Sequence, residues 1–219
     1  MQRTLILDLD GTLVDSVPDL AAALNRLMAS RALPDFTRPE VAAMVGDGAR
    51  VLIERAFAAR ARPVDAAALD DFLADYTAHA ADLTQPYPGV VETLAALAQD
   101  GWTLGVCTNK PEKAARILLD ALGLSQHFAA LGGGDSFPVR KPDAGHLLAT
   151  LAAAGGSPAA AVMAGDHHND IAAAHGAGMP AIFCAWGYGP AETGAHADAT
   201  AHSFNDVPRL AAALLARAG

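Results

Sequence analysis

Short apolar runs recur along the chain, and each is bounded by glycine, threonine or aspartate. The clearest runs cover residues 5–9, 103–107, 161–164 and 181–185, and a weaker run covers residues 128–131. Apolar runs of this length without polar alternation are typical of strands that are buried on both faces of a sheet. They predict four interior strands and a weaker fifth one.

Helical periodicity fills most of the segments between these runs. The predicted helices cover residues 90–99, 111–122, 144–154 and 171–177, and the second begins with a proline at its expected first position. Strands that alternate with helices favour a parallel arrangement with helices on both faces. The sequence therefore predicts an α/β fold with a doubly wound, Rossmann-like parallel sheet.

Residues 17–85 break this alternation. They are rich in alanine, leucine and arginine with helical periodicity, and prolines and a glycine pair interrupt them. We interpret them as a helical insertion after the first strand, because alanine is the best helix former and no strand-like run occurs there. The expected domains are an α/β core of residues 1–16 and 86–219 and an all-helical cap of residues 17–85. The two chain crossings, near residues 15–16 and 86–89, are expected to act as hinges.

Composition limits the partners that the protein can have. The 219-residue chain is 52% hydrophobic and 18% charged, with a formal net charge of −9, so nothing attracts it generally to nucleic acid or anionic lipid. No apolar run approaches the length of a membrane span. A strand-like run starts at Thr4, which leaves no room for a secretion signal, and a cytoplasmic location is expected. Cys107 and Cys184 lie in apolar runs and are expected to be packing residues.

Reactive side chains follow several predicted strands. Asp8 and Asp10 come directly after the first strand, with Gly11 next to them to allow a sharp turn. Ligands of open parallel sheets bind at the carboxyl ends of the strands. Two carboxylates that converge there repel each other unless a cation or a shared proton lies between them. A turn in which aspartate merely caps the next helix is the alternative for an isolated Asp-Gly pair.

Four short motifs occur in order along the chain: Asp-Leu-Asp-Gly-Thr at 8–12, Thr-Asn-Lys at 108–110, Arg-Lys-Pro-Asp at 140–143 and Gly-Asp-His-His-Asn-Asp at 165–170. Together they resemble the motifs of the haloacid dehalogenase superfamily. The matches over residues 7–16 and 46–55 narrow the resemblance to phosphoglycolate phosphatases. The resemblance implies the superfamily's core fold with an inserted cap, and a hydrolase that acts on a small phosphorylated metabolite.

The resemblance also implies a role for each matching residue. Asp8 would attack phosphorus and form an aspartyl-phosphate, and Asp10 would serve as acid and base. Mg²⁺ would bind Asp8, the backbone carbonyl of Asp10 and Asp166, while Asp170 would orient a water on the ion rather than bind it.

The phosphoryl group also needs partners. Thr108 and Lys141 would hold its oxygens, and Asn109 is also expected to bind the substrate. Lys141 is one of only three lysines in the chain, and a proline follows it at an expected helix start.

The cap is expected to choose the substrate. A glycolate leaving group carries a carboxylate, for which Arg50 and the backbone around Gly48 offer a guanidinium and amides at a helix start. This favours 2-phosphoglycolate, although Arg50 could instead pair with Glu54 along an exposed helix. A sugar phosphate or pyrophosphate remains an alternative substrate, and the protein is expected to be a monomer or homodimer.

Other functions use the same fold. A phosphomutase would return the phosphoryl group from Asp8 to a sugar, and a non-catalytic module would only bind a phosphorylated ligand. A phosphonate hydrolase that uses a cap lysine is nearly excluded, because no lysine lies between residues 10 and 105. His167 and His168 depart from the usual motif, and imidazoles there could admit Mn²⁺ or Co²⁺ beside Mg²⁺.

Overall fold

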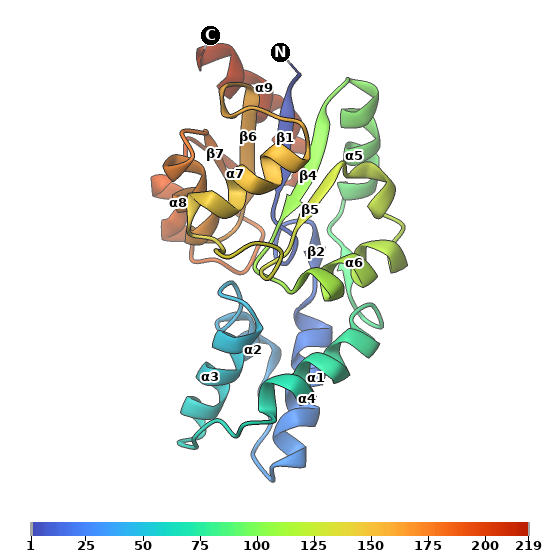
Figure 1. Ribbon diagram of the computed structural model, residues 1–219, viewed down its shortest axis with the longest axis vertical. Helices are drawn as coiled ribbons and strands as arrows, with labels where there is room; N and C mark the ends of the chain where they lie inside the picture. The colour runs from blue at the N-terminus through green and yellow to red at the C-terminus, as the bar shows by residue number, and fades with distance from the viewer. Residues whose placement is uncertain (1, 219) are drawn as a thin grey trace.

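A six-stranded sheet forms the centre of the upper part of the molecule in Figure 1. The computed structural model describes residues 2–218. All neighbouring strands of this sheet pair in parallel. In spatial order the strands are β5 (Ala130–Gly132), β4 (Thr103–Cys107), β1 (Thr4–Leu7), β6 (Ala161–Gly165), β7 (Ala181–Cys184) and β8 (Ala199–Ala201).

Helices cover both faces of the sheet (Figure 1). One face packs against α5 (Val90–Gln99), α6 (Glu112–Ala121) and α9 (Val207–Ala218). The other packs against α7 (Ala144–Ala153) and α8 (His168–Gly176). Alternate residues of β1 serve the two sides, because Leu5 and Leu7 join the first cluster and Ile6 joins the second. The predicted fold class is therefore confirmed.

The predicted interior strands and helices all occur, with small shifts at their ends. Helix α8 begins at His168, three residues before the predicted start, because the side chains of His167 and Asp170 form a capping box there. Pro142 does not open α7, since Asp143 caps a helix that starts at Ala144. Strand β8 and helix α9 had no counterpart in the sequence prediction.

A second group of helices lies below the carboxyl edge of the sheet in Figure 1. It contains α1 (Val17–Ser30), α2 (Arg38–Ala42), α3 (Ala49–Ala59) and α4 (Ala68–His79). These helices bury their own apolar cluster, which includes Leu24, Met28, Ile53 and Phe72. The segment thus has a separate core, and we refer to residues 17–84 as the helical segment.

The two crossings between the helical segment and the sheet lie side by side. Strand β2 (Val14–Asp15) pairs antiparallel with β3 (Gln85–Pro86), so Gln85 belongs to a short strand rather than to a helix. The Tyr188 hydroxyl donates to Asp15 (2.7 Å) and accepts from the Ser16 amide (2.8 Å). Use of these crossings as hinges, and the domain boundaries themselves, stay predictions. Within residues 2–218 the structure also contains four short 3₁₀ helices: η1 (Ser125–His127), η2 (Pro158–Ala160), η3 (Ala191–His196) and η4 (Phe204–Asp206).

Candidate active site

Three polar side chains project from the carboxyl ends of adjacent strands. Asp8 follows β1, Thr108 follows β4 and Asp166 follows β6. Because these strands are parallel neighbours, their carboxyl ends meet at one edge, and this edge faces the helical segment (Figure 1). The sheet therefore brings together residues that are more than 150 positions apart in the sequence.

A glycine turn lets the loop after β1 approach Asp166. Gly11 has a φ of +82°, in the left-handed region that favours glycine. A Cβ atom at this position would lie 2.4 Å from Asp166 Oδ2, which is too close for any side chain. The next residue, Thr12, donates its hydroxyl to Asp166 Oδ1 at 3.0 Å. The motif thus supplies Asp8 and also positions Asp166.

Asp8, Asp166 and Asp170 form one buried cluster of carboxylates. Each offers an oxygen within 4.8 Å of an oxygen of the others, and their exposed fractions are 8%, 2% and 0%. Lys141 Nζ lies 2.9 Å from Asp8 Oδ1 and 2.6 Å from Asp170 Oδ1. A single ammonium therefore serves two carboxylates, and with all three carboxylates ionised the cluster would carry more negative than positive charge.

Backbone amides fix the orientation of this cluster. The amides of Tyr188 and Gly189 donate to Asp166 Oδ2 at 2.8 and 3.2 Å, and the His167 amide donates to Asp170 Oδ2 at 3.0 Å. Gly187 is required for the first contact, since a Cβ there would lie 2.2 Å from Asp166 Cβ. These amides therefore hold the carboxylates of Asp166 and Asp170 in a fixed orientation.

Burial and mutual repulsion raise the pKa values of the cluster. Desolvation, with Asp170 and Asp166 nearby, raises the pKa of Asp8 to about 8, although Lys141 opposes the shift. Desolvation and Asp170 likewise raise the pKa of Asp166 to about 7. A hard divalent cation with oxygen ligands would relieve this repulsion. The donor set of Asp8, Asp166 and Asp170 therefore fits such an ion.

This electrostatic arrangement predicts that a divalent cation stabilises the protein more at high pH. The folded pKa values of Asp8 and Asp166 lie above the unfolded value of 3.8. Their contribution to stability is therefore present below that value and lost as the pH rises through about 7 to about 8. In thermal unfolding, the increase in Tm caused by Mg²⁺ over EDTA should be larger at about pH 8 than at about pH 5.5. An increase that is equal at both pH values would contradict this account, and Asp8→Asn should reduce the difference.

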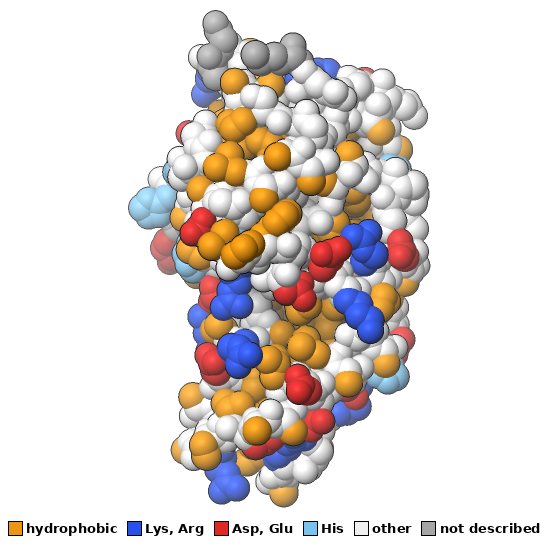
Figure 2. All heavy atoms as spheres, in the orientation of Figure 1, with side chains coloured by type: hydrophobic (Ala, Val, Ile, Leu, Met, Phe, Trp, Pro, Cys, Tyr) orange, Lys and Arg blue, Asp and Glu red, His pale blue; other side chains and the backbone are white. Residues whose placement is uncertain are grey.

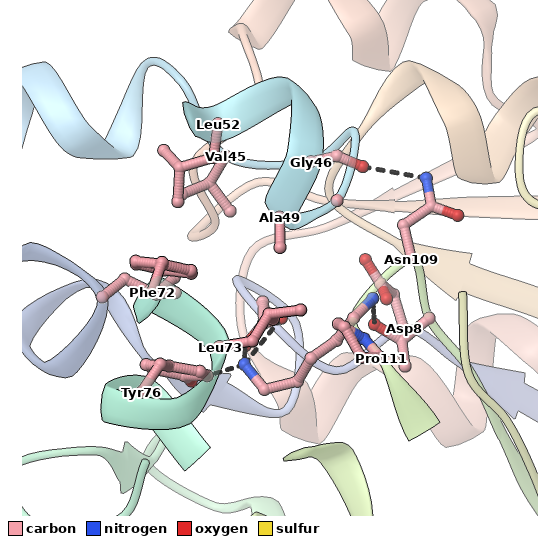
Figure 3. A pocket seen from close by; sticks show the side chains of 15 residues that line it. Asp8, Val45, Gly46, Ala49, Leu52, Phe72, Leu73, Tyr76, Asn109 and Pro111 are labelled. Carbon is pink, nitrogen blue, oxygen red and sulfur yellow. Dashed lines mark hydrogen bonds and ion pairs between the residues drawn. The ribbon is translucent and has the colours of Figure 1, made fainter. Parts of the chain in front are cut away.

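Asn109 links the sheet to the helical segment, and its neighbour Thr108 lies at the same sheet edge. Thr108 is 2% exposed and lines a cavity between the two parts. Asn109 Nδ2 donates to the carbonyl of Lys141 at 2.9 Å and to that of Gly46 at 3.0 Å (Figure 3). The predicted contacts of Thr108 and Asn109 with a substrate stay predictions.

Asp10 takes a different position from its neighbour Asp8. Both of its carboxylate oxygens accept from Lys110 Nζ, at 2.9 and 3.2 Å. Lys110 also donates to the Tyr76 hydroxyl at 2.5 Å (Figure 3). The side chain predicted to act as acid and base is thus held by a lysine and, through it, by a helix of the helical segment.

The cavity between the two parts has a polar side and an apolar side. Asp8, Asp10, Thr108, Asn109 and Lys110 line it from the sheet edge. Apolar residues of the helical segment line the opposite side, as Figure 3 shows for Val45, Leu52, Phe72 and Leu73. A polar ligand would therefore sit with its reacting group against the sheet.

Of the two residues predicted to bind substrate from the cap, Gly48 lines the cavity and Arg50 does not. Gly48 lines the cavity with a φ of +88° and stands directly before α3. Arg50 is exposed and is not among the residues that line the cavity. As the second residue of α3, it faces solvent, so in this conformation it is not positioned to hold a substrate carboxylate. Within residues 2–218, Arg50 and Glu54 do not form an ion pair either.

Known proteins share both the sequence and the fold. Residues 5–184 match the family of haloacid dehalogenase-like hydrolases. A phosphoglycolate phosphatase of Caulobacter vibrioides is 46% identical over 218 residues, which cover 97% of this chain and 92% of that protein. One of Agrobacterium fabrum is 47% identical over 187 residues, with coverages of 84% and 80%. The crystal structure of a predicted phosphoglycolate phosphatase from Haemophilus somnus 129pt has a TM-score of 0.87 at 32% identity, and covers 96% of this chain and 98% of that one.

The chain belongs to the haloacid dehalogenase-like hydrolases. Its resemblance to phosphoglycolate phosphatases is confirmed, and the chain is a phosphatase. This excludes a module that only binds a phosphorylated ligand. No helix in the described part of the phosphatase combines the length and apolar character that crossing a membrane requires.

The two histidines of the last motif lie outside the carboxylate cluster of the phosphatase. His167 Nδ1 accepts from the Asn169 amide at 3.4 Å, and its ring lies against Gly46. Burial lowers the pKa of His167. His167 and His168 group with Asp47 instead of with Asp8 and Asp166. Their influence on the choice of metal stays a prediction.

Several residues at the site were not predicted from the sequence. They are Tyr76, Lys110, Gly187, Tyr188 and Gly189. The Gly-Tyr-Gly triplet after β7 is a sequence signal, because two glycines at a strand end suggest close backbone approach. Tyr76 gave no signal, since a tyrosine in an alanine-rich helix is ordinarily a packing residue.

The visible surface carries charges of both signs. Around the junction of the two parts, acidic and basic side chains lie close together in Figure 2, with hydrophobic side chains visible in the hollow between them. This face of the phosphatase therefore has no extended basic surface of the kind that binds nucleic acid.

Proposed function

We propose that this phosphatase is a Mg²⁺-dependent phosphomonoester hydrolase that works through an aspartyl-phosphate and converts 2-phosphoglycolate into glycolate and phosphate. The observation that carries the proposal is the buried carboxylate cluster with Lys141 at the sheet edge. The names of its relatives favour the substrate. A cytoplasmic monomer or homodimer remains the expected state of the enzyme.

Asp8 is suited to be the nucleophile. Its carboxylate lies at the strand end on the polar side of the cavity, and the ammonium of Lys141 stands 2.9 Å away. An oxygen of Asp8 would attack phosphorus while the bond from phosphorus to the leaving alkoxide breaks. Lys141 would offset the charge that builds up on the phosphoryl oxygens, and the Thr108 hydroxyl would bind one of them.

Asp10 would complete both half-reactions. Its carboxyl gives a proton to the departing alkoxide, which leaves as glycolate. The resulting carboxylate then takes a proton from a water whose oxygen attacks phosphorus, and the bond between Asp8 and phosphorus breaks to release phosphate. Each half-reaction balances, and both need Asp10 to be free of its present ion pair with Lys110.

Mg²⁺ would be held by Asp8 and Asp166, with the Asp10 carbonyl as a further predicted ligand and Asp170 beside them. When bound, the ion supplies positive charge that offsets the carboxylates and draws the phosphoryl group to Asp8. The hydroxyl of Thr12 and the amides of Tyr188 and Gly189 keep Asp166 in orientation for this role. This role for Asp166 would require the close approach of the loop after β7 to its carboxylate.

A panel of phosphorylated metabolites, ranked by kcat/KM with Mg²⁺ and with EDTA, tests the proposal. We expect 2-phosphoglycolate to lead the panel and EDTA to abolish turnover. A panel led by a sugar phosphate or pyrophosphate would contradict the substrate, and activity that survives EDTA would contradict the metal. Transfer of phosphate to a sugar instead of water would indicate a phosphomutase.

A further inference from the structure

One buried cation lies in the cavity between the sheet edge and the helical segment. Lys110 is the only residue with a positive side chain among the described residues that line the cavity, and it is 5% exposed. It faces the apolar side formed by the helical segment, with its Nζ 4.4 Å from the centre of the Tyr76 ring. A buried ammonium is costly unless it is paired.

Lys110 has two partners, and one of them is the predicted acid. Its Nζ bonds to both oxygens of Asp10 and to the Tyr76 hydroxyl. Burial raises the pKa of Tyr76 to about 12, so the phenol keeps its proton and accepts from the lysine through its oxygen. In this arrangement, Asp10 is not free to give a proton to a leaving group.

We propose that Lys110 binds the carboxylate of the leaving group and releases Asp10 in exchange. This inference rests on the function proposed above. A substrate carboxylate has the same charge and shape as the Asp10 side chain, so Lys110 stays paired throughout the exchange. Once released, the Asp10 carboxylate takes up a proton from solvent water, turns to the leaving oxygen and gives that proton to it.

The exchange discriminates between substrates through an unpaired charge. A leaving group that ends in a hydroxyl instead of a carboxylate gives Lys110 no replacement anion. Releasing Asp10 would then leave a buried ammonium without a counter-charge, which is strongly unfavourable. Lys110 therefore favours substrates that carry a carboxylate, and with other phosphomonoesters it keeps Asp10 in the ion pair, where Asp10 cannot act as the acid.

Tyr76 makes this exchange depend on the position of the helical segment. It belongs to α4 and is 2% exposed, with its ring stacked on Phe72 at 5.7 Å between centroids. Its hydroxyl keeps Lys110 in place from the side opposite the sheet. Lys110 is therefore aligned for a substrate carboxylate when the helical segment closes over the sheet edge.

Pairs of substrates that differ only in the carboxylate provide the test. We would measure kcat/KM for 2-phosphoglycolate and 2-hydroxyethyl phosphate, and for 3-phosphoglycerate and glycerol 3-phosphate. The wild type should prefer the carboxylate in each pair. Lys110→Met should reduce that preference by about 10- to 100-fold, the range expected for a hydrogen bond between two charged groups. Lys110→Met also removes the ion-pair partner of Asp10. This loss changes kcat/KM for both substrates of a pair, so it cancels in the ratio of the two kcat/KM values.

Matched variants separate recognition from folding. Lys113→Met removes an exposed lysine three residues further along the chain, in the first turn of α6, and should leave the preference unchanged. In the Asp8→Asn background, Lys110→Met should raise the Kd of 2-phosphoglycolate by a similar factor. It should raise the Kd of 2-hydroxyethyl phosphate much less. Tyr76→Phe keeps the stacked ring and removes only the hydroxyl, so it should reduce the carboxylate preference by a smaller factor. This variant provides the test if Lys110→Met does not fold.

The outcomes distinguish this inference from the proposed function. If another substrate leads the metabolite panel while Lys110→Met still abolishes the carboxylate preference, the proposed substrate fails and Lys110 remains the recognition residue. If the preference survives in Lys110→Met, or if Arg50→Ala removes it instead, the inference is overturned. A wild type without any preference for carboxylates would overturn both.

Discussion

Asp8→Asn should lower kcat by more than about 10²-fold, which is the lower end of the loss expected when one acid–base group is removed. An amide is a poor nucleophile, so the first half-reaction has no substitute in the site. The change also removes one of the anions that Lys141 pairs with at 2.9 Å. Steady-state kinetics with the leading substrate of the metabolite panel measures the effect.

The Asp8 variant needs a control for folding and for general charge effects. Asp70→Asn changes an exposed aspartate in the first turn of α4 and should leave kcat within about twofold, as is usual for surface positions. Thermal unfolding should show that both variants are folded. If Asp8→Asn kept more than about a hundredth of the wild-type kcat, covalent catalysis by Asp8 would be wrong.

Lys141→Met should damage both stability and catalysis. The ammonium of Lys141 is 1% exposed and also donates to the Cys107 carbonyl at 2.5 Å. Its neighbours Asp170 and Asp8 raise the pKa of Lys141, against the effect of burial, so it stays charged. Removing it leaves these carboxylates without their cation, and we expect the free energy of unfolding to fall by about 3 kcal/mol, as for other broken buried pairs. The same change should lower kcat by about 10²- to 10³-fold, the cost of losing one preorganised charge.

Urea unfolding at about pH 8, where Asp8 and Asp166 are more ionised than at neutral pH, measures the change in the free energy of unfolding. Lys113→Met is the matched control and should change the free energy of unfolding by less than about 0.5 kcal/mol. Adding Asp170→Asn to Lys141→Met should cost less than the sum of the single changes, because each removes the partner of the other. A Lys141→Met protein as stable as the wild type would contradict the assignment of Lys141 to this cluster.

The sequence predicted the central strands because their burial leaves a simple pattern. Residues of β1, β4, β6 and β7 are apolar on both sides, since helices cover both faces of the sheet. Strand β8 escaped prediction because it has only three residues, Ala199–Ala201, at the edge of the sheet. The pairing of β2 with β3 was not predicted either, since two residues are too few to show a period and the paired residues are 70 or 72 positions apart.

The candidate site was predictable where motifs follow strands. Asp8 and Asp166 lie in one cluster because parallel strands end at the same edge, and this could be inferred before the structure. The prediction was weaker for the helical segment, where no rule of topology fixes which helix face points at the sheet. Arg50 illustrates this, because its place two residues after Gly48 gave it a helix start but not a direction toward the cavity.

Lys110 shows what sequence reasoning missed. It stands in the second motif, but its neighbours Thr108 and Asn109 offered clearer roles toward a phosphoryl group. Its importance comes from two partners that are distant in sequence, Asp10 and Tyr76. Only the fold brings these groups together, so the pairing of a buried cation could not be deduced from spacing alone.

The stereochemical course at phosphorus tests the central claim most directly. Hydrolysis of a chiral, isotopically labelled thiophosphate ester in labelled water reports how many times the phosphoryl group is transferred. An aspartyl-phosphate on Asp8 requires two in-line displacements, so the account predicts overall retention of configuration. Inversion would mean that water attacks the substrate directly, and would contradict Asp8 as the nucleophile.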